Sequence, residues 1–202
     1  STHCISSAAS DVYKRQDLAS FSAHKIGGPV GIGALWVKRG VELRPVSPGG
    51  GQQYGMRSGT QPVALACGFA AALRACVDEF DTMTARWQSW RRRVIAWCRQ
   101  QPEVTVDDAP MTSPSIIHLS VAGARGTDLV MLADRDGIDL SAGSACHAGV
   151  SRPSPTMLAM GRDDDAASSG LRISMGYTTT DVDIDRLLVT LPATIRKASG
   201  AR

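Results

Sequence analysis

The chain has 202 residues, of which 43% are hydrophobic and 20% are charged, and its formal net charge is +3. This length and composition allow a sizeable core in one domain or two small ones, and the weak charge without a long basic stripe argues against a nucleic-acid-binding protein. We find neither a membrane-spanning run of roughly 18 apolar residues nor a secretory signal pattern, so we expect a cytoplasmic protein.

The first sixteen residues show neither a helical nor a strand period. We interpret residues 1–16 as a foreign or artefactual leader and exclude them from the fold prediction. The sequence from Leu18 onward is typical of the middle of a folded domain.

A lysine then lies on a short turn that leads into a glycine-rich run. Ser22, His24 and Lys25 fall within four residues of one another. An amine on such a turn, partly removed from water, loses its proton more readily, as Schiff-base chemistry requires. The hydroxyl and the imidazole could donate to a phosphate. A solvated surface lysine is the alternative, and the turn alone does not decide between the two.

An apolar run at residues 31–38 predicts a buried strand, and a glycine-dense loop follows at residues 48–60. The loop backbone could approach a ligand or a second subunit closely, whereas a plain linker is the alternative. Arg57, Ser58 and Thr60 are anion-seeking groups, and Thr60 stands before a helix whose first amides also attract anions. The apolar positions that predict this helix are Val63, Ala66, Phe69, Ala70 and Leu73.

A second helical period follows and should end near Gln101-Pro102. Its apolar positions are Met83, Trp87, Trp90, Val94 and Trp97. We predict that these side chains belong to the core, and that the arginines at 91–93 form a solvated face rather than a binding patch.

The second half alternates between short strands and helices, which predicts an α/β or α+β domain. The strands are expected at residues 104–106, 115–121, 138–140 and 171–175. The helices are expected at residues 127–133, capped by Thr127, and 154–160, and after a capping box formed by Thr180 and Asp183. Pro192 should break or kink the last helix. His118, within a strand, is predicted to be a satisfied core histidine rather than a ligand.

Residues 141–155 are mostly small and have the composition of a mobile, exposed loop, with Cys146 in the middle. A thiol held there is free to travel and react, and a loop cysteine without a task is the alternative. His147 could lower the pKa of the thiol, although adjacent side chains often diverge.

Three other cysteines lie in apolar segments with a helical period, namely Cys67, Cys76 and Cys98. We predict that they are small core residues. The odd total of five cysteines at wide spacing argues against a disulfide framework or a structural zinc site.

Four motifs, in their order and separation, resemble the cysteine desulfurases, which are pyridoxal-phosphate-dependent enzymes of the class V aminotransferase fold, and in particular the group with a long cysteine-bearing loop. The motifs are Ser22-Ala-His-Lys-Ile-Gly-Gly-Pro29, Gly49-Gly-Gly-Gln-Gln-Tyr-Gly-Met-Arg-Ser-Gly-Thr60, Ser141-Ala-Gly-Ser-Ala-Cys146 and Leu171-Arg-Ile-Ser-Met-Gly-Tyr-Thr-Thr179. The resemblance implies an α/β fold with the C-terminal remnant of the large cofactor-binding domain at 17–80 and the small C-terminal domain at 81–202.

The resemblance also implies a site for pyridoxal 5′-phosphate. It makes Lys25 the Schiff-base lysine, which also moves protons at the substrate α-carbon. Ser22 and His24 would hold the cofactor phosphate, and Thr60 would reach the phosphate of the partner subunit across a homodimer. No metal is implied.

For the sulfur chemistry, the resemblance makes Cys146 the nucleophile that takes sulfur from L-cysteine as a persulfide while alanine leaves. Arg172 would hold the substrate carboxylate, which suits a two-pronged guanidinium. The cofactor serves as an electron sink, and a thiolate on a flexible loop can then deliver its sulfur to an acceptor or an iron–sulfur scaffold protein.

The chain departs from the family pattern in three ways. Gln53-Tyr54 replaces an acidic–basic pair, and Ala142 stands where serine is frequent. From the resemblance we also expect the chain to lack the front of the large domain with its stacking histidine. Since catalysis depends on fixing the cofactor ring, we expect weak or absent turnover from this chain alone. The alternatives are another class V enzyme, namely a selenocysteine lyase or an aminotransferase, or a non-catalytic sulfur-transfer or scaffold-binding module.

Overall fold

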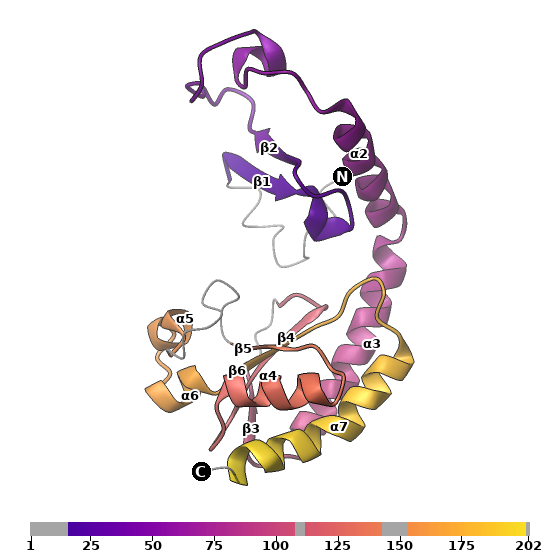
Figure 1. Cartoon of the computed structure of the whole chain (residues 1–202), viewed down its shortest axis with the longest axis vertical. Coiled ribbons are helices and arrows are strands. Elements are labelled where there is room, and N and C mark those ends of the chain that lie inside the picture. The colour runs from indigo at the N-terminus through magenta and orange to yellow at the C-terminus, as the bar shows by residue number, and fades with distance from the viewer. Residues whose placement is uncertain (1–15, 108–111, 143–152, 201–202) are drawn as a thin grey trace. The chain divides into compact units, whose positions relative to one another are not determined.

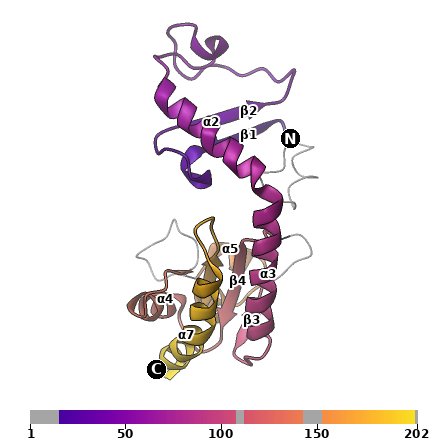
Figure 2. The same ribbon diagram turned by 90° about the vertical axis from the view of Figure 1, so that its right-hand side faces the viewer.

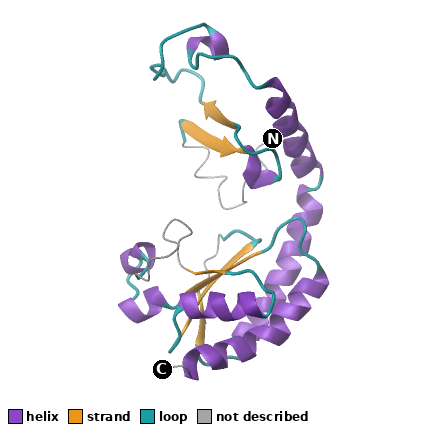
Figure 3. Ribbon diagram, in the orientation of Figure 1, coloured by secondary structure: helices purple, strands orange, loops and turns teal. Residues whose placement is uncertain are grey.

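The computed structural model describes residues 16–107, 112–142 and 153–200 (Figure 1). The chain divides into two compact units, the first ending at Asp81 and the second beginning at Thr82. Each unit combines helices with a small sheet (Figure 3). Within the described ranges no helix is long and apolar enough to cross a membrane.

The first unit is built on an antiparallel hairpin followed by a helix. Its elements are β1 (Leu18–Ser22), the 3₁₀ turn η2 (Ala23–Ile26), β2 (Gly33–Val37), the 3₁₀ turn η3 (Gln52–Gly55) and α2 (Val63–Asp78). Ser22 pairs with Gly33 at the end of the hairpin that leads into η2. A Cβ at Gly33 would lie 2.5 Å from the carbonyl oxygen of Phe21, so only glycine allows this close pairing.

The first unit buries very little of its apolar surface. Among its described residues only Ala23 is buried, and α2 contains no buried residue at all. The prediction of a strand at residues 31–38 is confirmed, but the prediction that it is buried is wrong, because Leu35 and Trp36 are 54% and 47% exposed. No second layer within the described part of this unit covers the strand.

The second unit is a four-stranded antiparallel sheet with helices packed against it. The strands run in the order β3 (Val104–Val106), β4 (Ile116–Val121), β6 (Gly170–Ser174) and β5 (Ser141–Ala142). The helices are α3 (Phe80–Cys98), α4 (Gly126–Arg135), α5 (Pro155–Ala159), α6 (Asp164–Ser168) and α7 (Asp181–Gly200). Helices α4 and α7 lie side by side (Figure 2).

One face of this sheet forms the core of the second unit. Ile117 and Leu119 of β4 are fully buried, as is Leu171 of β6, and they pack with apolar side chains from α3, α4 and α7. Since side chains alternate along a strand, His118, Ser120 and Arg172 face the opposite side of the sheet. The predicted tryptophan core is confirmed at Trp90, which is 1% exposed, whereas Trp87 and Trp97 are only partly buried.

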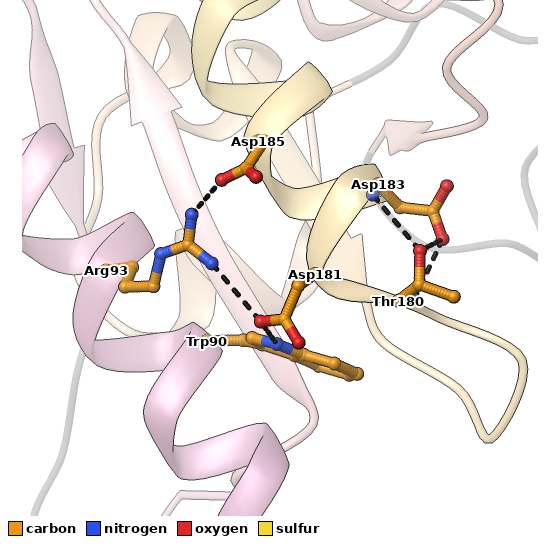
Figure 4. A network of polar contacts seen from close by, with 6 residues as sticks. All are labelled: Trp90, Arg93, Thr180, Asp181, Asp183 and Asp185. Atoms are coloured by element: carbon orange, nitrogen blue, oxygen red, sulfur yellow. Dashed lines mark hydrogen bonds and ion pairs between the residues drawn. The ribbon is translucent and has the colours of Figure 1, made fainter.

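Helices α3 and α7 are tied together by the polar network of Figure 4. The buried indole of Trp90 donates to Asp181 over 2.7 Å, and the Arg93 guanidinium reaches both Asp181 and Asp185. The predicted solvated arginine face is therefore wrong in part, since Arg93 is half-buried and ion-paired. Arg91 likewise donates to the carbonyl oxygen of Ser113 over 3.2 Å.

The predicted capping box at the start of α7 is confirmed. Both the amide and the hydroxyl of Thr180 donate to Asp183 over 2.8 Å, which lowers the pKa of that carboxyl, the side-chain hydrogen bond being the larger cause. Helix α7 runs through Pro192 without a break, because Leu191 and Ile195 on either side are buried in the core and hold the helix in place.

Two other predicted elements are wrong in detail. Residues 138–140 are not a strand, because Ile138 is held against the end of α4 by donating to the carbonyl oxygen of Ala133, and the strand begins at Ser141. Thr127 is not the cap of α4, since the cap position is Arg125. The helix begins at Gly126, where a Cβ would lie 2.3 Å from the carbonyl oxygen of Gly170.

The cysteine predictions hold only in part. Cys98 is a buried core residue, and desolvation raises the pKa of its thiol to about 11. Cys67 is exposed, and Cys76 is disulfide-bonded, so neither is the small core thiol that the helical period predicts. An apolar period on α2 indicates burial only if another layer covers that helix.

Candidate active site

The predicted lysine turn is present in the first unit and is rigidly closed. Ser22 ends β1, and His24 and Lys25 lie in η2. The only buried residue of the turn, Ala23, donates its amide to the carbonyl oxygen of Ile32 over 3.1 Å and accepts from the amide of Gly28 over 2.9 Å. The sequence thus fixes the backbone of the turn through Ala23 and directs its neighbours outward.

The three candidate side chains of this turn are exposed. Ser22, His24 and Lys25 make no hydrogen bond or ion pair with another described side chain. Gly27 closes the turn with a φ of 77°, a left-handed conformation that glycine adopts without strain. The structure therefore brings together a hydroxyl, an imidazole and an amine on one short turn, as predicted, but the amine of Lys25 is exposed rather than partly removed from water.

The turn is held against helix α2 by close contacts of small residues. A Cβ at Gly28 would lie 3.0 Å from the carbonyl oxygen of Ala23 and 3.2 Å from the Cβ of Ala72. A Cβ at Gly68 of α2 would likewise lie 3.1 Å from the ring of Pro29. Glycines at these two positions let the turn and the helix approach each other, which gives Lys25 a firm support.

The glycine loop has ordered internal contacts around its anion-seeking residues. The Ser58 hydroxyl donates to the carbonyl oxygen of Ser47 over 3.3 Å, and the Gly59 amide donates to the Gln52 side chain over 3.1 Å. Thr60 is exposed just ahead of α2, and no hydrogen bond or ion pair between described residues joins it to the lysine turn. Arg57 donates to the neighbouring carbonyl oxygen of Ser58, which leaves most of its donors for another partner.

Gln53 and Tyr54, the two residues of this loop that depart from the family motif, have an unusual backbone conformation. Gln53 and Tyr54 have φ values of 51° and 58°, the left-handed region in which residues other than glycine are uncommon. Tyr54 is 98% exposed. Both residues are therefore presented outward by the backbone of η3 rather than packed inside the first unit.

In the second unit, Arg172 lies in the middle of β6, between two neighbouring strands. It is directly opposite His118 of β4 and Ser141 of β5. Its Nη2 donates to the Ser141 hydroxyl over 3.3 Å, while its Nε is buried and has no hydrogen-bond partner among the described residues. A buried donor without a partner costs roughly 1–3 kcal/mol, so this guanidinium is suited to receive an anionic group.

A buried carboxylate on the same face of the sheet accounts for His118. Asp107, which follows β3, accepts from His118 Nδ1 over 2.8 Å, from the Ser120 hydroxyl over 3.4 Å and from the Arg162 guanidinium. The prediction of a satisfied histidine is confirmed, but its predicted place in the core is wrong, because His118 lies on the face of the sheet opposite the core and its side chain is 25% exposed. The sequence gives no signal for Asp107 itself, because Asp-Asp after a short strand is typical of a surface turn.

The two remaining candidate residues, Cys146 and His147, lie outside the described residues. The strand before that segment ends at Ala142, and Ser154 caps the helix after it, accepting from the amide of Met157 over 3.5 Å. Among the described residues, no group of three or more His, Cys, Asp or Glu side chains could hold a metal ion.

The donor set of the lysine turn fits pyridoxal 5′-phosphate. This cofactor offers an aldehyde, which needs an amine, and a phosphate, which needs hydrogen-bond donors. Lys25 supplies the amine, and Ser22 and His24 supply donors that no described side chain occupies. The turn by itself does not supply a group that would stack on the cofactor ring.

Residues 4–187 match the family model described as aminotransferase class V. Over 185 residues the chain is 40% identical to an IscS-like cysteine desulfurase of Mycobacterium tuberculosis, covering 90% of this chain and 47% of that protein. The chain therefore spans about half the length of the curated relatives it matches.

Solved structures are likewise matched over about half of their length. A NifS-like protein superposes with a TM-score of 0.79 at 29% identity, covering 91% of this chain and 47% of that one. A structure of SspA in complex with cysteine superposes with a TM-score of 0.60 at 26% identity, covering 81% of this chain and 45% of that one.

Proposed function

The chain belongs to the class V aminotransferase family, and we propose that it carries the lysine turn, the substrate arginine and the nucleophilic cysteine of a pyridoxal-phosphate-dependent cysteine desulfurase. In the structure, the feature that supports this proposal most directly is Arg172, whose buried Nε lacks a partner within the part of the chain that the structure describes. An amino-acid carboxylate would supply that partner.

Each group has a distinct task in this reaction. Ser22 and His24 donate to the cofactor phosphate, and the Lys25 amine holds the cofactor aldehyde and moves a proton at the substrate α-carbon. When bound, pyridoxal 5′-phosphate supplies an electron sink for the substrate. Arg172 binds the carboxylate of L-cysteine and fixes its orientation.

The sulfur is transferred to Cys146. Its thiolate attacks the substrate sulfur, so that a sulfur–sulfur bond forms on the protein, the carbon–sulfur bond of the substrate breaks, and alanine leaves. The resulting persulfide is then passed to an acceptor or an iron–sulfur scaffold protein. The IscS-like relative and the complex of SspA with cysteine support L-cysteine as the substrate.

We place this reaction in a cytoplasmic homodimer, in which Thr60 reaches the phosphate bound by the partner subunit. Its exposed position just ahead of α2 supports such a role, because the first amides of a helix attract anions. No described feature favours a selenocysteine lyase, an aminotransferase or a non-catalytic module over a cysteine desulfurase.

The proposal is tested first by cofactor binding. We expect the chain to gain visible absorbance with pyridoxal 5′-phosphate, and Lys25→Ala to abolish it. Lys38→Ala is the matched control, because Lys38 is an exposed lysine of the same unit whose ion pair among the described residues is with Asp17, over 3.3 Å. Absorbance that survives Lys25→Ala unchanged would overturn the role of the turn.

The sulfur step is tested by mass spectrometry of the peptide that contains Cys146. After incubation with L-cysteine and the cofactor, we expect one added sulfur atom on that peptide and release of alanine. A non-catalytic module would add no sulfur, and release of alanine that does not depend on L-cysteine would indicate another class V reaction. Weak turnover is expected, because the lysine turn by itself supplies no group that would stack on the cofactor ring and so fix it.

A further inference from the structure

A short serine-bearing strand lies beside the candidate substrate arginine in the second unit. Resting on the proposed function, we propose that Ser141 is a positioning residue, which orients the Arg172 guanidinium toward the carboxylate of an amino-acid substrate. Ser141 would act only through Arg172 and would not touch the reacting atoms.

The register of the sheet places the two side chains together. Ser141 and Arg172 are directly opposite each other in the antiparallel pair β5–β6. Side chains of such a pair lie on the same face of the sheet with their Cβ atoms about 4.5–5.5 Å apart. The Arg172 Nη2 donates to the Ser141 hydroxyl over 3.3 Å, a contact that a shorter or apolar side chain could not replace.

The strand that carries Ser141 is firmly held. Helix α4 begins at Gly126, where a Cβ would lie 2.3 Å from the carbonyl oxygen of Gly170 and 3.2 Å from the Cβ of Ala142. Strand β5 is therefore confined between α4 on one side and β6 on the other. A hydroxyl on such a strand has little freedom to move, so it can fix a partner.

The neighbour on the other side of Arg172 cannot take this role. His118 is directly opposite Arg172 in β4, but its Nδ1 is engaged with Asp107 over 2.8 Å. Its Nε2 lies 3.0 Å from the position that a Cβ of Gly170 would occupy, which turns the ring along β4 and β6 rather than toward the guanidinium. Among the described side chains, Ser141 is thus the acceptor that Arg172 has.

The bond to Ser141 engages Nη2 and leaves the buried Nε–H without a partner among the described residues. In a guanidinium, Nε–H and one N–H of the neighbouring terminal nitrogen lie parallel along one edge. Two parallel N–H groups match the two oxygens of a carboxylate. Because an arginine side chain loses rotamer freedom when it is fixed, pre-orientation by Ser141 favours carboxylate binding.

The test follows the side-chain Nε–H signal of Arg172 by NMR in the isotope-labelled chain, assigned by its loss in Arg172→Lys. Without ligand, we expect Ser141→Ala to shift or broaden this signal and Ser141→Thr, which keeps the hydroxyl, to restore it. Ser174→Ala is the matched control, since Ser174 is an exposed serine two residues from Arg172 on β6. With L-alanine as a non-reacting carboxylate probe, Ser141→Ala should bind about 3- to 10-fold more weakly, the range expected for one hydrogen bond.

Each outcome decides one of the two proposals. An Arg172 signal and an L-alanine affinity that Ser141→Ala leaves unchanged would overturn the role of Ser141, and so would a changed signal with unchanged affinity. The role of Arg172 in the proposed function fails separately, if L-alanine does not move the Arg172 signal of the unsubstituted chain or if Arg172→Lys binds L-alanine equally well. Weaker binding in Ser141→Ala but not in Ser174→Ala, with recovery in Ser141→Thr, supports the positioning role.

Discussion

Removing the buried carboxylate of Asp107 should destabilise the second unit measurably. The Asp107 side chain is only 9% exposed and accepts from His118, Arg162 and Ser120. These donors come from β4 and from the segment between α5 and α6, so one carboxylate ties that segment to the sheet. The substitution Asp107→Ala would release all of these contacts at once.

The size of the loss follows from the exposure of each donor. The His118 side chain is 25% exposed, so its Nδ1–H would lose its acceptor at a mostly buried position, which costs about 1–3 kcal/mol. The Arg162 side chain is 41% exposed and regains water, so its ion pair adds about 0–1 kcal/mol. Ser120 keeps the carbonyl oxygen of Ala166 as an acceptor over 3.4 Å and adds little. We expect a total of about 1–4 kcal/mol.

The assay is urea unfolding followed by tryptophan fluorescence. Trp36→Phe removes the tryptophan of the first unit, so that the remaining signal reports on the second unit alone. Asp139→Ala is the matched control, because Asp139 is exposed and makes no hydrogen bond or ion pair with a described residue. It should change the free energy of unfolding by less than about 0.5 kcal/mol. If Asp107→Ala changed it equally little, the buried network would not hold the segment to the sheet.

Three further substitutions or conditions test other contacts of the second unit. Asp181→Ala leaves the buried indole N–H of Trp90 without its acceptor and should lower the free energy of unfolding by about 1–3 kcal/mol in the same urea assay. Asp183→Asn should lower the free energy of unfolding at neutral pH in the same assay. Because hydrogen bonds from Thr180 lower the pKa of the Asp183 carboxyl below 3.8, this loss of stability should be constant above pH 3.8. It should vanish as the pH falls through the lowered pKa. Burial raises the thiol pKa of Cys98 from 9.0 to about 11, so peptide mass mapping should show that Cys98 resists alkylation at pH 9 until urea unfolds the chain. The free energy of unfolding, measured in urea, should decline as the pH rises from 9.0 toward 11. Alkylation at equal rates with and without urea would contradict this.

The elements that could be predicted from the sequence are those with a strong period and a clear boundary. Strand β3 and helix α3 have about the predicted ranges, and the capping box of α7 is present. The errors arise where a tertiary contact decides. The start of α4 is set by the close approach of Gly126 to β6, and the burial of β2 depends on a layer that the described part of the first unit does not contain.

The candidate site divides in the same way. The lysine turn could be found from its single lysine among small residues, whereas Arg172 is indicated only by the resemblance of residues 171–179 to a family motif. Asp107 and Ser141 could not, since their importance depends on which residues lie opposite them in the sheet. An antiparallel register cannot be read from short strands separated by long connections, and β5 has only two residues.

The precision of the site in the second unit comes from its core. Leu171 and Ile173 are 0% and 3% exposed on one face of β6, and a shift of that strand by one residue would expose both of them. Burial of these two side chains therefore locks the register, and the register alone places Arg172 opposite Ser141. The polar face of the sheet thus needs no interactions of its own to fix which residues meet on it. Hydrogen bonds on this face, such as that from Arg172 to Ser141, only select among the rotamers of the side chains. The Ser141 hydroxyl is therefore expected to affect the orientation of Arg172 and not the folding of the second unit.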